Sequence, residues 1–233
     1  MTGFPAISAD QMREVDRAMI EEFHIELMQM MENAGRALAE LAVDVFGPRR
    51  VVVLAGAGGN GGGGLVAARH LSNRGHEVRV VLDRPADRLG GVPAHQLDIL
   101  TRMGVPVTDD PGPADVVVDA LIGYSLVGDP TGRAADLIDW ANEQSAPVLS
   151  LDTPSGLDVT TGVTARPCVT ATATLTLALP KTGLLDAPEA GRLYLADISV
   201  PPLVYRRMGI DVGDLFADNQ IIALSPSQHL PQQ

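Results

Sequence analysis

The residue pattern with the clearest chemical potential is a glycine-rich run between two apolar segments. It reads Gly56-Ala-Gly-Gly-Asn-Gly-Gly-Gly-Gly64, follows the apolar stretch Val51–Ala55 and precedes the apolar stretch Leu65–Leu71. Glycines at a strand-to-helix junction leave backbone N–H groups open, so a phosphate can approach the start of the helix closely. The run therefore predicts a binding loop for a phosphorylated ligand.

Two common phosphate motifs can be tested against this loop. A Walker loop needs a Gly-Lys-Ser/Thr sequence, and the run contains no lysine, so that motif is excluded. The dinucleotide fingerprint GxGxxG matches at Gly56, Gly58 and Gly61, and Asp83 ends the next predicted strand, where an acid would bind ribose. This match alone favours an NAD(P)-dependent oxidoreductase. A run so rich in glycine matches many patterns, however, and no catalytic Tyr-Lys or His-Asp signature accompanies it.

Acidic and hydroxyl side chains follow two other predicted strands. Asp119 ends an apolar stretch, and Asp152 and Ser155 belong to the segment Asp152-Thr-Pro-Ser-Gly-Leu-Asp158. Oxygen ligands of these types suit a hard cation, and a carboxylate in a cleft can transfer protons. The same residues also fit structural roles, because Asp119 and Asp152 can bond the backbone of turns and Ser155 can cap a short helix. Both interpretations stay open at this point.

The elements that position these residues alternate along the chain. A helical stretch over residues 8–47 comes first and ends at Gly47-Pro48. The sequence then predicts strands over Val51–Ala55, His76–Leu82, Val105–Val107, Asp115–Ile122, Pro147–Leu151, Thr170–Leu179 and Arg192–Val200, and helices over Leu65–Leu71, His95–Met103 and Ala134–Asn142. Threonine alternates with apolar residues over 170–179, which predicts a strand with one polar face. Arg192–Val200 is the last predicted strand, and the polar tail over 225–233 is predicted to be flexible.

This alternation predicts an α/β fold, a three-layer, Rossmann-like, doubly wound and mostly parallel sheet with helices on both faces. No linker or repeat divides the 233 residues, so a single domain over 1–233 is expected. Ligands of such sheets bind beyond the carboxyl ends of the strands. The loops predicted at that edge are Gly56–Gly64, Gly123–Gly132, Asp152–Asp158 and Pro180–Leu184.

Composition excludes several classes of partner. The chain has 29 acidic and 17 basic residues and a net charge of −12, so nucleic acid and anionic membranes are not expected ligands. No apolar run approaches the roughly 20 residues of a membrane span, and no signal peptide is evident. Cys168 is the only cysteine, which leaves no internal disulfide. These features predict a cytoplasmic protein.

Six segments resemble, in order, those of the NAD(P)H-hydrate epimerase family, whose members carry a YjeF N-terminal domain. Gly58 to Leu71 resembles the family loop GNNGGDGLVAARHL, and the match as a whole covers residues 8–202. The other five segments are Met31-Glu-Asn-Ala-Gly35 (MExAG), Asp119-Ala-Leu-Ile-Gly123 (DALFG), Asp152–Asp158 with Gly162 (DxPSGLDxxTG), Thr174 through Leu184 (TxxxxPKxGL) and Ala196 to Pro201 (DIGIP).

The resemblance implies an activity and its partners. Family enzymes interconvert the R and S forms of hydrated NADH and NADPH, called NADHX and NADPHX, at C6 of the nicotinamide ring. A separate ATP- or ADP-dependent dehydratase would then repair the S form. The family also implies a potassium ion and a homodimer, and the Met-rich N-terminal helices over residues 8–47 are the expected subunit contact.

The resemblance also implies site residues. Asn60, Asp119 and Ser155 match the potassium ligands, and Asp152 matches the acid at the substrate, where it would act as general acid and base. The implied substrate-binding residues are Gly59, Asn60, Gly61, Gly62, Gly63, Gly123, Tyr124, Ser125, Leu126, Val127, Gly128, Asp152 and Lys181.

The chain departs from the family within these loops. Gly59 replaces the first Asn of GNNGGDG and Gly63 replaces its Asp, while Tyr124 and Ser125 replace small residues. Loss of the acid at position 63 removes a carboxylate expected near the substrate. These departures support a second hypothesis, a non-catalytic nucleotide-binding or scaffold member of the same family.

Overall fold

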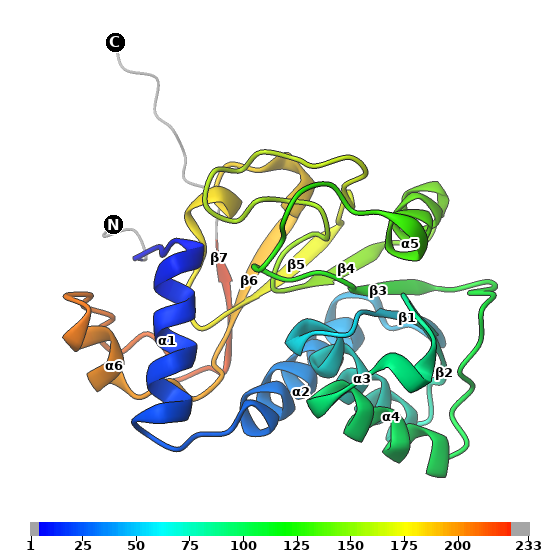
Figure 1. Ribbon diagram of the computed structural model, residues 1–233, viewed down its shortest axis with the longest axis horizontal. Helices are drawn as coiled ribbons and strands as arrows, with labels where there is room; N and C mark the ends of the chain where they lie inside the picture. Colours follow the sequence, from blue (N-terminus) through cyan, green and yellow to red (C-terminus); the bar gives the residue numbers. More distant parts are fainter. Residues whose placement is uncertain (1–4, 225–233) are drawn as a thin grey trace.

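Six parallel strands and one antiparallel strand form the sheet of this protein (Figure 1). The computed structural model describes residues 5–224. In chain order the strands are β1 (Arg50–Ala55), β2 (Glu77–Leu82), β3 (Val116–Ala120), β4 (Val148–Leu151), β5 (Ala173–Leu177), β6 (Arg192–Ala196) and β7 (Ile221–Leu224). Their order across the sheet is β2-β1-β3-β4-β5-β6-β7, so the chain proceeds outward from β1 in both directions. The predicted doubly wound α/β class is confirmed.

Helices cover both faces of the sheet, as Figure 1 shows. They are α1 (Ala9–Glu21), α2 (Leu27–Phe46), α3 (Gly59–Asn73), α4 (Gly91–Arg102), α5 (Gly132–Glu143) and α6 (Pro202–Arg207), with short 3-10 turns at Ala86–Arg88, Thr182–Leu184 and Pro188–Ala190. Alternate side chains of β1 point to opposite faces. Val51 and Val53 pack into the large core shared with α1 to α4, whereas Val52 and Leu54 pack with Leu137 of α5.

The N-terminal helical stretch is two helices rather than one. Residues 22–26 separate α1 from α2, and His24 in this break has a positive φ of 54°. Four of the five methionines of these helices are buried in the core of the chain itself, namely Met12, Met19, Met30 and Met31, and Met28 is exposed. The methionine stripe that the sequence offered as a subunit contact is therefore mainly internal packing.

The glycine-rich run is mostly helix, which corrects the prediction of a loop over Gly56–Gly64 and of a helix that begins at Leu65. Helix α3 begins at Gly59, so only the first three residues of the run connect it to β1. Close packing explains the composition. A Cβ on Gly61 would lie 1.8 Å from the carbonyl oxygen of Gly56, and one on Gly64 would lie 2.4 Å from Cβ of Ala120.

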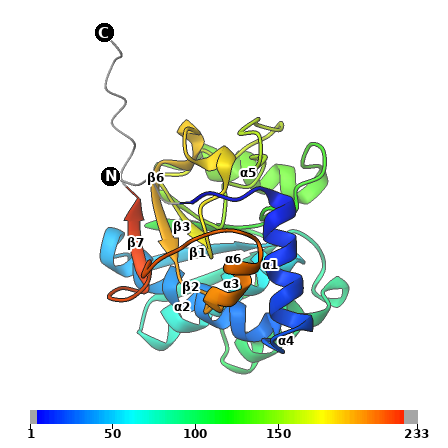
Figure 2. The same ribbon diagram turned by 90° about the vertical axis from the view of Figure 1, so that its left-hand side faces the viewer.

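Three other predicted elements differ from the structure. Val105–Val107 contributes one isolated parallel bridge, between Val107 and Val80, instead of a strand. The threonines expected on a polar face, Thr174 and Thr176, are fully buried because both faces of β5 are covered. Arg192–Val200 is not the last strand, since β7 pairs antiparallel with β6 (Figure 2). The tail predicted to be flexible, 225–233, lies outside the described residues.

The segment that precedes α1 is bonded to the loop around Lys181. Ile7 forms a parallel bridge with Lys181, its N–H donates to the carbonyl of Pro180 at 2.9 Å, and its carbonyl accepts from the N–H of Thr182 at 3.0 Å. Ser8 then caps α1, and its hydroxyl accepts from the backbone N–H three residues later. The start of the N-terminal helix is thereby fixed to the connection between β5 and β6.

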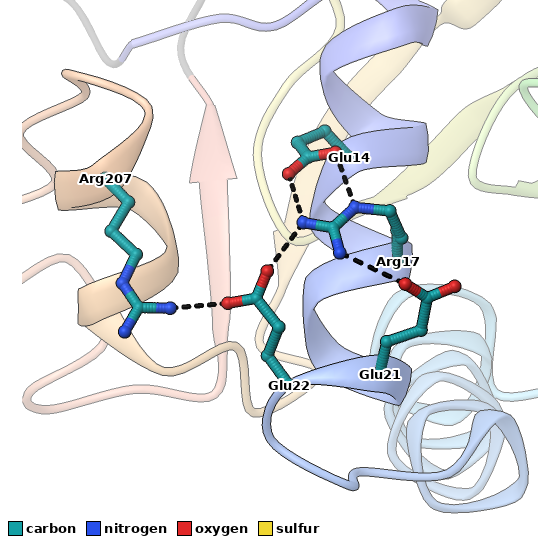
Figure 3. Close-up of polar contacts among 5 residues, drawn as sticks. All are labelled: Glu14, Arg17, Glu21, Glu22 and Arg207. Carbon is teal, nitrogen blue, oxygen red and sulfur yellow. Dashed lines mark hydrogen bonds and ion pairs between the residues drawn. The ribbon is translucent and has the colours of Figure 1, made fainter.

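The other end of α1 is tied to α6, which lies next to it in Figure 2. Glu22 accepts from Arg17 at 2.6 Å and also pairs with Arg207 of α6 (Figure 3). Arg17 also bonds Glu14 and Glu21, so its guanidinium is shared among three carboxylates. These pairs are largely exposed, and water screens exposed ion pairs, so they orient α1 more than they stabilise it.

None of the helices within residues 5–224 combines the length and apolarity that a membrane span requires.

Candidate active site

A cleft of about 490 Å³ opens at the carboxyl ends of β1 to β4. Its walls come from the segments that follow those strands, with Asp83 after β2, Gly58–Asn60 at the start of α3, residues 121–127 and 129–131 after β3 and Asp152 after β4. Helix α1 contributes Met12 and Asp16 to the same cleft. The cleft therefore lies at the switch point between β1 and β3, where doubly wound sheets bind ligands.

Asp152 is held at the wall of this cleft by a buried lysine. The ammonium of Lys181 is fully buried and pairs with Oδ1 of Asp152, and it also donates to the carbonyl of Leu177 at 2.8 Å and to Oγ1 of Thr176 at 3.3 Å. The second oxygen, Oδ2, accepts from the backbone N–H of Tyr124 at 3.2 Å. A buried ammonium requires an anionic partner, so Asp152 and Lys181 form one structural unit.

The backbone of Asp152 adopts a positive φ of 65°. Non-glycine residues rarely occupy this region, although aspartate tolerates it better than most, and such residues cluster at functional sites. Here the conformation follows directly after β4 and leaves the carboxylate between Lys181 behind it and the cleft in front.

Asp119 forms the polar centre beneath the cleft. Its Oδ2 accepts from Oγ of Ser150 at 2.8 Å and from the N–H of Ser155 at 2.9 Å, while Oδ1 accepts from Oγ of Ser155 at 2.6 Å and from the N–H of Leu121 at 3.3 Å. Burial raises the pKa of the Asp119 carboxyl, and the hydrogen bonds from Ser155 and Ser150 oppose that rise. These bonds join β3, β4 and the loop after β4.

The oxygens around Asp119 fit a hard monovalent cation. Oγ of Ser155 lies 3.2 Å from the carbonyl oxygen of Ile122, and the side chain of Asn60 packs against Gly123. The buried Nδ2 of Asn60 has no hydrogen-bond partner among residues 5–224. An Asn amide can be turned over to present its oxygen instead. Carboxylate, hydroxyl, carbonyl and amide oxygens together suit potassium, whereas no group of three or more His, Cys, Asp or Glu in the described chain could hold a metal ion.

A second carboxylate faces the cleft from α1. The phenol of Tyr124 donates to Oδ2 of Asp16, while the backbone N–H of Tyr124 bonds Asp152, so Tyr124 links the two acids. Burial raises the pKa of Asp16; the hydrogen bond from Tyr124 and the charge of Lys181 lower it, and the charge of Asp152 raises it further. Burial and the neighbouring Asp16 also raise the pKa of the Tyr124 phenol well above its usual value.

Asp16 was not predicted from the sequence because this helical stretch was assigned to a subunit contact. Asp16 stands four residues after Met12 and three before Met19, and both methionines are buried. A charged residue on a buried helical face was the available signal, because such a residue needs a partner or a function.

Residues 27–183 match a family model described as the YjeF-related protein N-terminus. The chain belongs to this family. An NAD(P)H-hydrate epimerase from Dehalogenimonas lykanthroporepellens is 50% identical over 213 residues, which cover 88% of this chain and 86% of the relative. One from Truepera radiovictrix is 36% identical and is matched over 94% of its length.

Longer relatives and a solved structure extend the comparison. The bifunctional NAD(P)H-hydrate repair enzyme Nnr of Salinibacter ruber is 37% identical over 87% of this chain, which spans only 42% of that enzyme. The crystal structure of yeast ynu0 superimposes with a TM-score of 0.83 at 24% sequence identity and covers 94% of this chain. The YjeF N-terminal fold is therefore shared across this distance in sequence.

The structure brings most of the residues implied by the family resemblance to the cleft. Its lining includes Gly59, Asn60, Gly123, Tyr124, Ser125, Leu126, Val127 and Asp152. The members of the predicted set that do not line it are Gly61, Gly62, Gly63, Gly128, Asp119, Ser155 and Lys181. Gly61 to Gly63 are buried inside α3, and Lys181 lies behind Asp152 rather than in the cleft.

Proposed function

We propose that this cleft is the active site of an NAD(P)H-hydrate epimerase, which interconverts the R and S forms of NADHX and NADPHX. The observation that carries the proposal is the buried pair of Asp152 and Lys181 at the cleft wall. It occurs in a chain that is 50% identical to a protein named NAD(P)H-hydrate epimerase. The chain is thus an isomerase that acts on a damaged nicotinamide nucleotide.

The chemistry of the reaction explains why a carboxylate is needed. C6 of the hydrated ring bears a hydroxyl and is bonded to the ring nitrogen, so inversion requires the C–O or C–N bond to break and reform. Both routes move a proton to and from an oxygen. The C–N route removes the hydroxyl proton and returns it when the ring closes, whereas the C–O route protonates the departing hydroxyl and later removes a proton from the water that adds back. Asp152 is the cleft carboxylate placed to accept and return that proton, while Lys181 and the N–H of Tyr124 fix its two oxygens.

The remainder of the cleft binds the substrate. The first N–H groups of α3, at Gly59 and Asn60, and the loop over 123–128 form the region that would receive the pyrophosphate. Asn60, Asp119 and Ser155, with the carbonyl of Ile122, would hold potassium. A bound potassium ion supplies a positive charge beside the phosphates. The hydroxyl of Ser155 donates to Oδ1 of Asp119, and both oxygens keep lone pairs that could bind the ion.

The same proposal includes the cellular context that the family implies. The enzyme works in the cytoplasm as a homodimer, and a separate ATP- or ADP-dependent dehydratase consumes the S form. The bifunctional relatives, which are more than twice as long as the segment they share with this chain, support such a partner. Size-exclusion chromatography with light scattering tests the dimer.

A coupled repair assay tests the activity. An S-specific dehydratase with ATP first consumes S-NADHX, and this protein is then added with potassium while NADH absorbance is followed. A second rise faster than spontaneous epimerisation is expected. Asp152→Asn should slow this rise by about 10²- to 10⁴-fold, the usual contribution of a general acid or base.

The variant needs a structural control because Asp152 neutralises Lys181. Breaking a buried ion pair destabilises a protein by about 3–5 kcal/mol. The double variant Asp152→Asn/Lys181→Met removes both charges, so it should regain stability and remain inactive. Asp87→Asn changes an exposed aspartate outside the cleft and should retain full activity. Absence of any second rise with the folded wild-type protein would contradict the epimerase and favour a nucleotide-binding or scaffold protein.

A further inference from the structure

The charged side chains that line the cleft are acidic except for one arginine, although a dinucleotide carries negatively charged phosphates. Its lining carries the four carboxylates of Asp16, Asp83, Asp129 and Asp152. Of the described residues that line it, Arg84 is the one with a cationic side chain, because Lys181 is fully buried behind Asp152. A substrate rich in phosphate must therefore meet its side-chain cation at Arg84.

The position of Arg84 identifies the part of the substrate that it meets. Arg84 follows β2, and β1 and β3 separate β2 from β4, which precedes Asp152. Three strand spacings of about 4.8 Å place the two strand ends roughly 14 Å apart. The start of α3 lies between them, after β1. A dinucleotide with its nicotinamide ring at Asp152 and its pyrophosphate at α3 therefore places its adenosine ribose at Arg84.

Asp83 orients the side chain of Arg84 and occupies only some of its hydrogen-bond donors. Its Nε donates to Oδ1 of Asp83 at 2.9 Å and its Nη2 to Oδ2 at 2.8 Å. A guanidinium has five N–H donors, so three remain. The side chain is 48% exposed, whereas that of Asp83 is only 6% exposed. Asp83 thus holds the guanidinium in place and leaves its outer donors open to a ligand.

We propose that Arg84 binds the 2′-phosphate that distinguishes NADPHX from NADHX, so that this enzyme prefers the hydrated form of NADPH. The inference rests on the proposed function, because it assigns the adenosine end of the same cleft. In doubly wound sheets the end of the second strand meets the adenosine ribose, where an acid bonds the 2′-hydroxyl and an arginine accommodates a 2′-phosphate. Both carboxylate oxygens of Asp83 are bonded to Arg84, so the positive charge of the guanidinium offsets the repulsion between this carboxylate and the phosphate.

Two measurements on Arg84→Gln test the inference. Calorimetry compares the binding of adenosine 2′,5′-bisphosphate with that of adenosine 5′-monophosphate. The coupled assay compares kcat/KM for NADPHX with kcat/KM for NADHX. A charged hydrogen-bonded contact contributes about 1.5–3 kcal/mol, so the preference for the 2′-phosphorylated partner should fall by about tenfold or more in both measurements.

Matched variants separate recognition from general charge. Arg84→Lys keeps the charge without the fork and should retain part of the preference. Arg88→Gln removes an exposed arginine four residues away that does not line the cleft, and it should leave the preference unchanged. A wild-type protein that binds the bisphosphate no better than the monophosphate, or an Arg84→Gln variant with an unaltered preference, overturns the inference. If neither hydrate is epimerised, the proposed function fails, and the calorimetry alone still decides the role of Arg84.

Discussion

Gly63 replaces the aspartate of the family loop, and we explain this glycine by its close packing against β4. The residue sits in α3 and faces β4, and a Cβ built on it would lie 2.7 Å from Cδ2 of Leu151 and 3.5 Å from Sδ of Met31. Leu151 is fully buried, so it has little room to move. Restoring the family acid with Gly63→Asp would therefore force a carboxylate into a filled space whose nearest side-chain atoms, from Leu151, Met31 and Ala34, are apolar.

The size of the effect follows from three terms. Overpacking a core costs about 1–3 kcal/mol, and burying a polar group without a partner costs about 1–3 kcal/mol in proteins. Aspartate gains only a few tenths of a kcal/mol over glycine in helix propensity. Gly63→Asp should thus lower the free energy of unfolding by about 2–5 kcal/mol, a large part of the typical 5–15 kcal/mol. Gly63→Ala keeps the steric term but gains about 1 kcal/mol of helix propensity, so a loss of about 0–2 kcal/mol is expected.

Urea unfolding followed by circular dichroism measures these values, and a double-mutant cycle locates their origin. Leu151→Val shortens the facing side chain and should cost about 1 kcal/mol by itself. Combined with Gly63→Ala it should cost about 0.5–2 kcal/mol less than the sum of the single variants, since the residues are in contact. An additive cycle, or a Gly63→Asp variant as stable as the wild type, would refute this explanation of the glycine.

Two further predictions concern titratable groups. The pKa of Asp16 is raised above 3.8 in the fold, mainly by burial, among the neighbours Tyr124, Lys181 and Asp152. The folded protein then holds this proton to higher pH than the unfolded chain, so stability is lost as pH rises from 3.8 through the folded pKa. Asp16→Asn removes that loss and should unfold at higher urea than the wild type at pH 7, with a difference that shrinks toward pH 4; a constant difference would contradict the assignment. Burial raises the pKa of Cys168 to about 12, so iodoacetamide at pH 8 should alkylate it far more slowly in native protein than in urea, and equal rates would disprove its protection.

The sequence predicted the parts of the fold that depend on local pattern. The apolar runs around Val53 and Val118 became central strands, since both faces of such strands are buried. The threonines of β5 misled the prediction because hydroxyls can be satisfied inside the core. Thr174 donates to the carbonyl of Ala190 at 2.8 Å, and Thr176 accepts from Lys181. Alternating polarity therefore does not imply exposure when the turns between two strands supply hydrogen-bond partners.

The site was predictable where a residue follows a strand and not where it comes from a distant element. Asp152 and Asp119 stand at strand ends, so the edge that they share follows from parallel topology. The contact of Asp16 with Tyr124 spans 108 residues and has no local signal apart from the charge on a buried face. The burial of Lys181 was equally hidden, because lysine is almost never fully buried unless paired. The glycines of α3 indicated that another group approaches the helix backbone closely. The sequence did not distinguish a ligand phosphate from a packed strand as that group.

The anchoring of α1 affects the order in which the walls of the cleft can assemble. Asp16 precedes every strand of the sheet in the chain, yet the segment before α1 pairs with Pro180–Thr182, which is synthesised much later. The sheet from β1 to β4 can assemble before that segment exists, but the wall that carries Asp16 cannot. The cleft therefore cannot be completed before residues 180–182 have been synthesised, and transient detachment of α1 would open it while β1 to β4 remain paired.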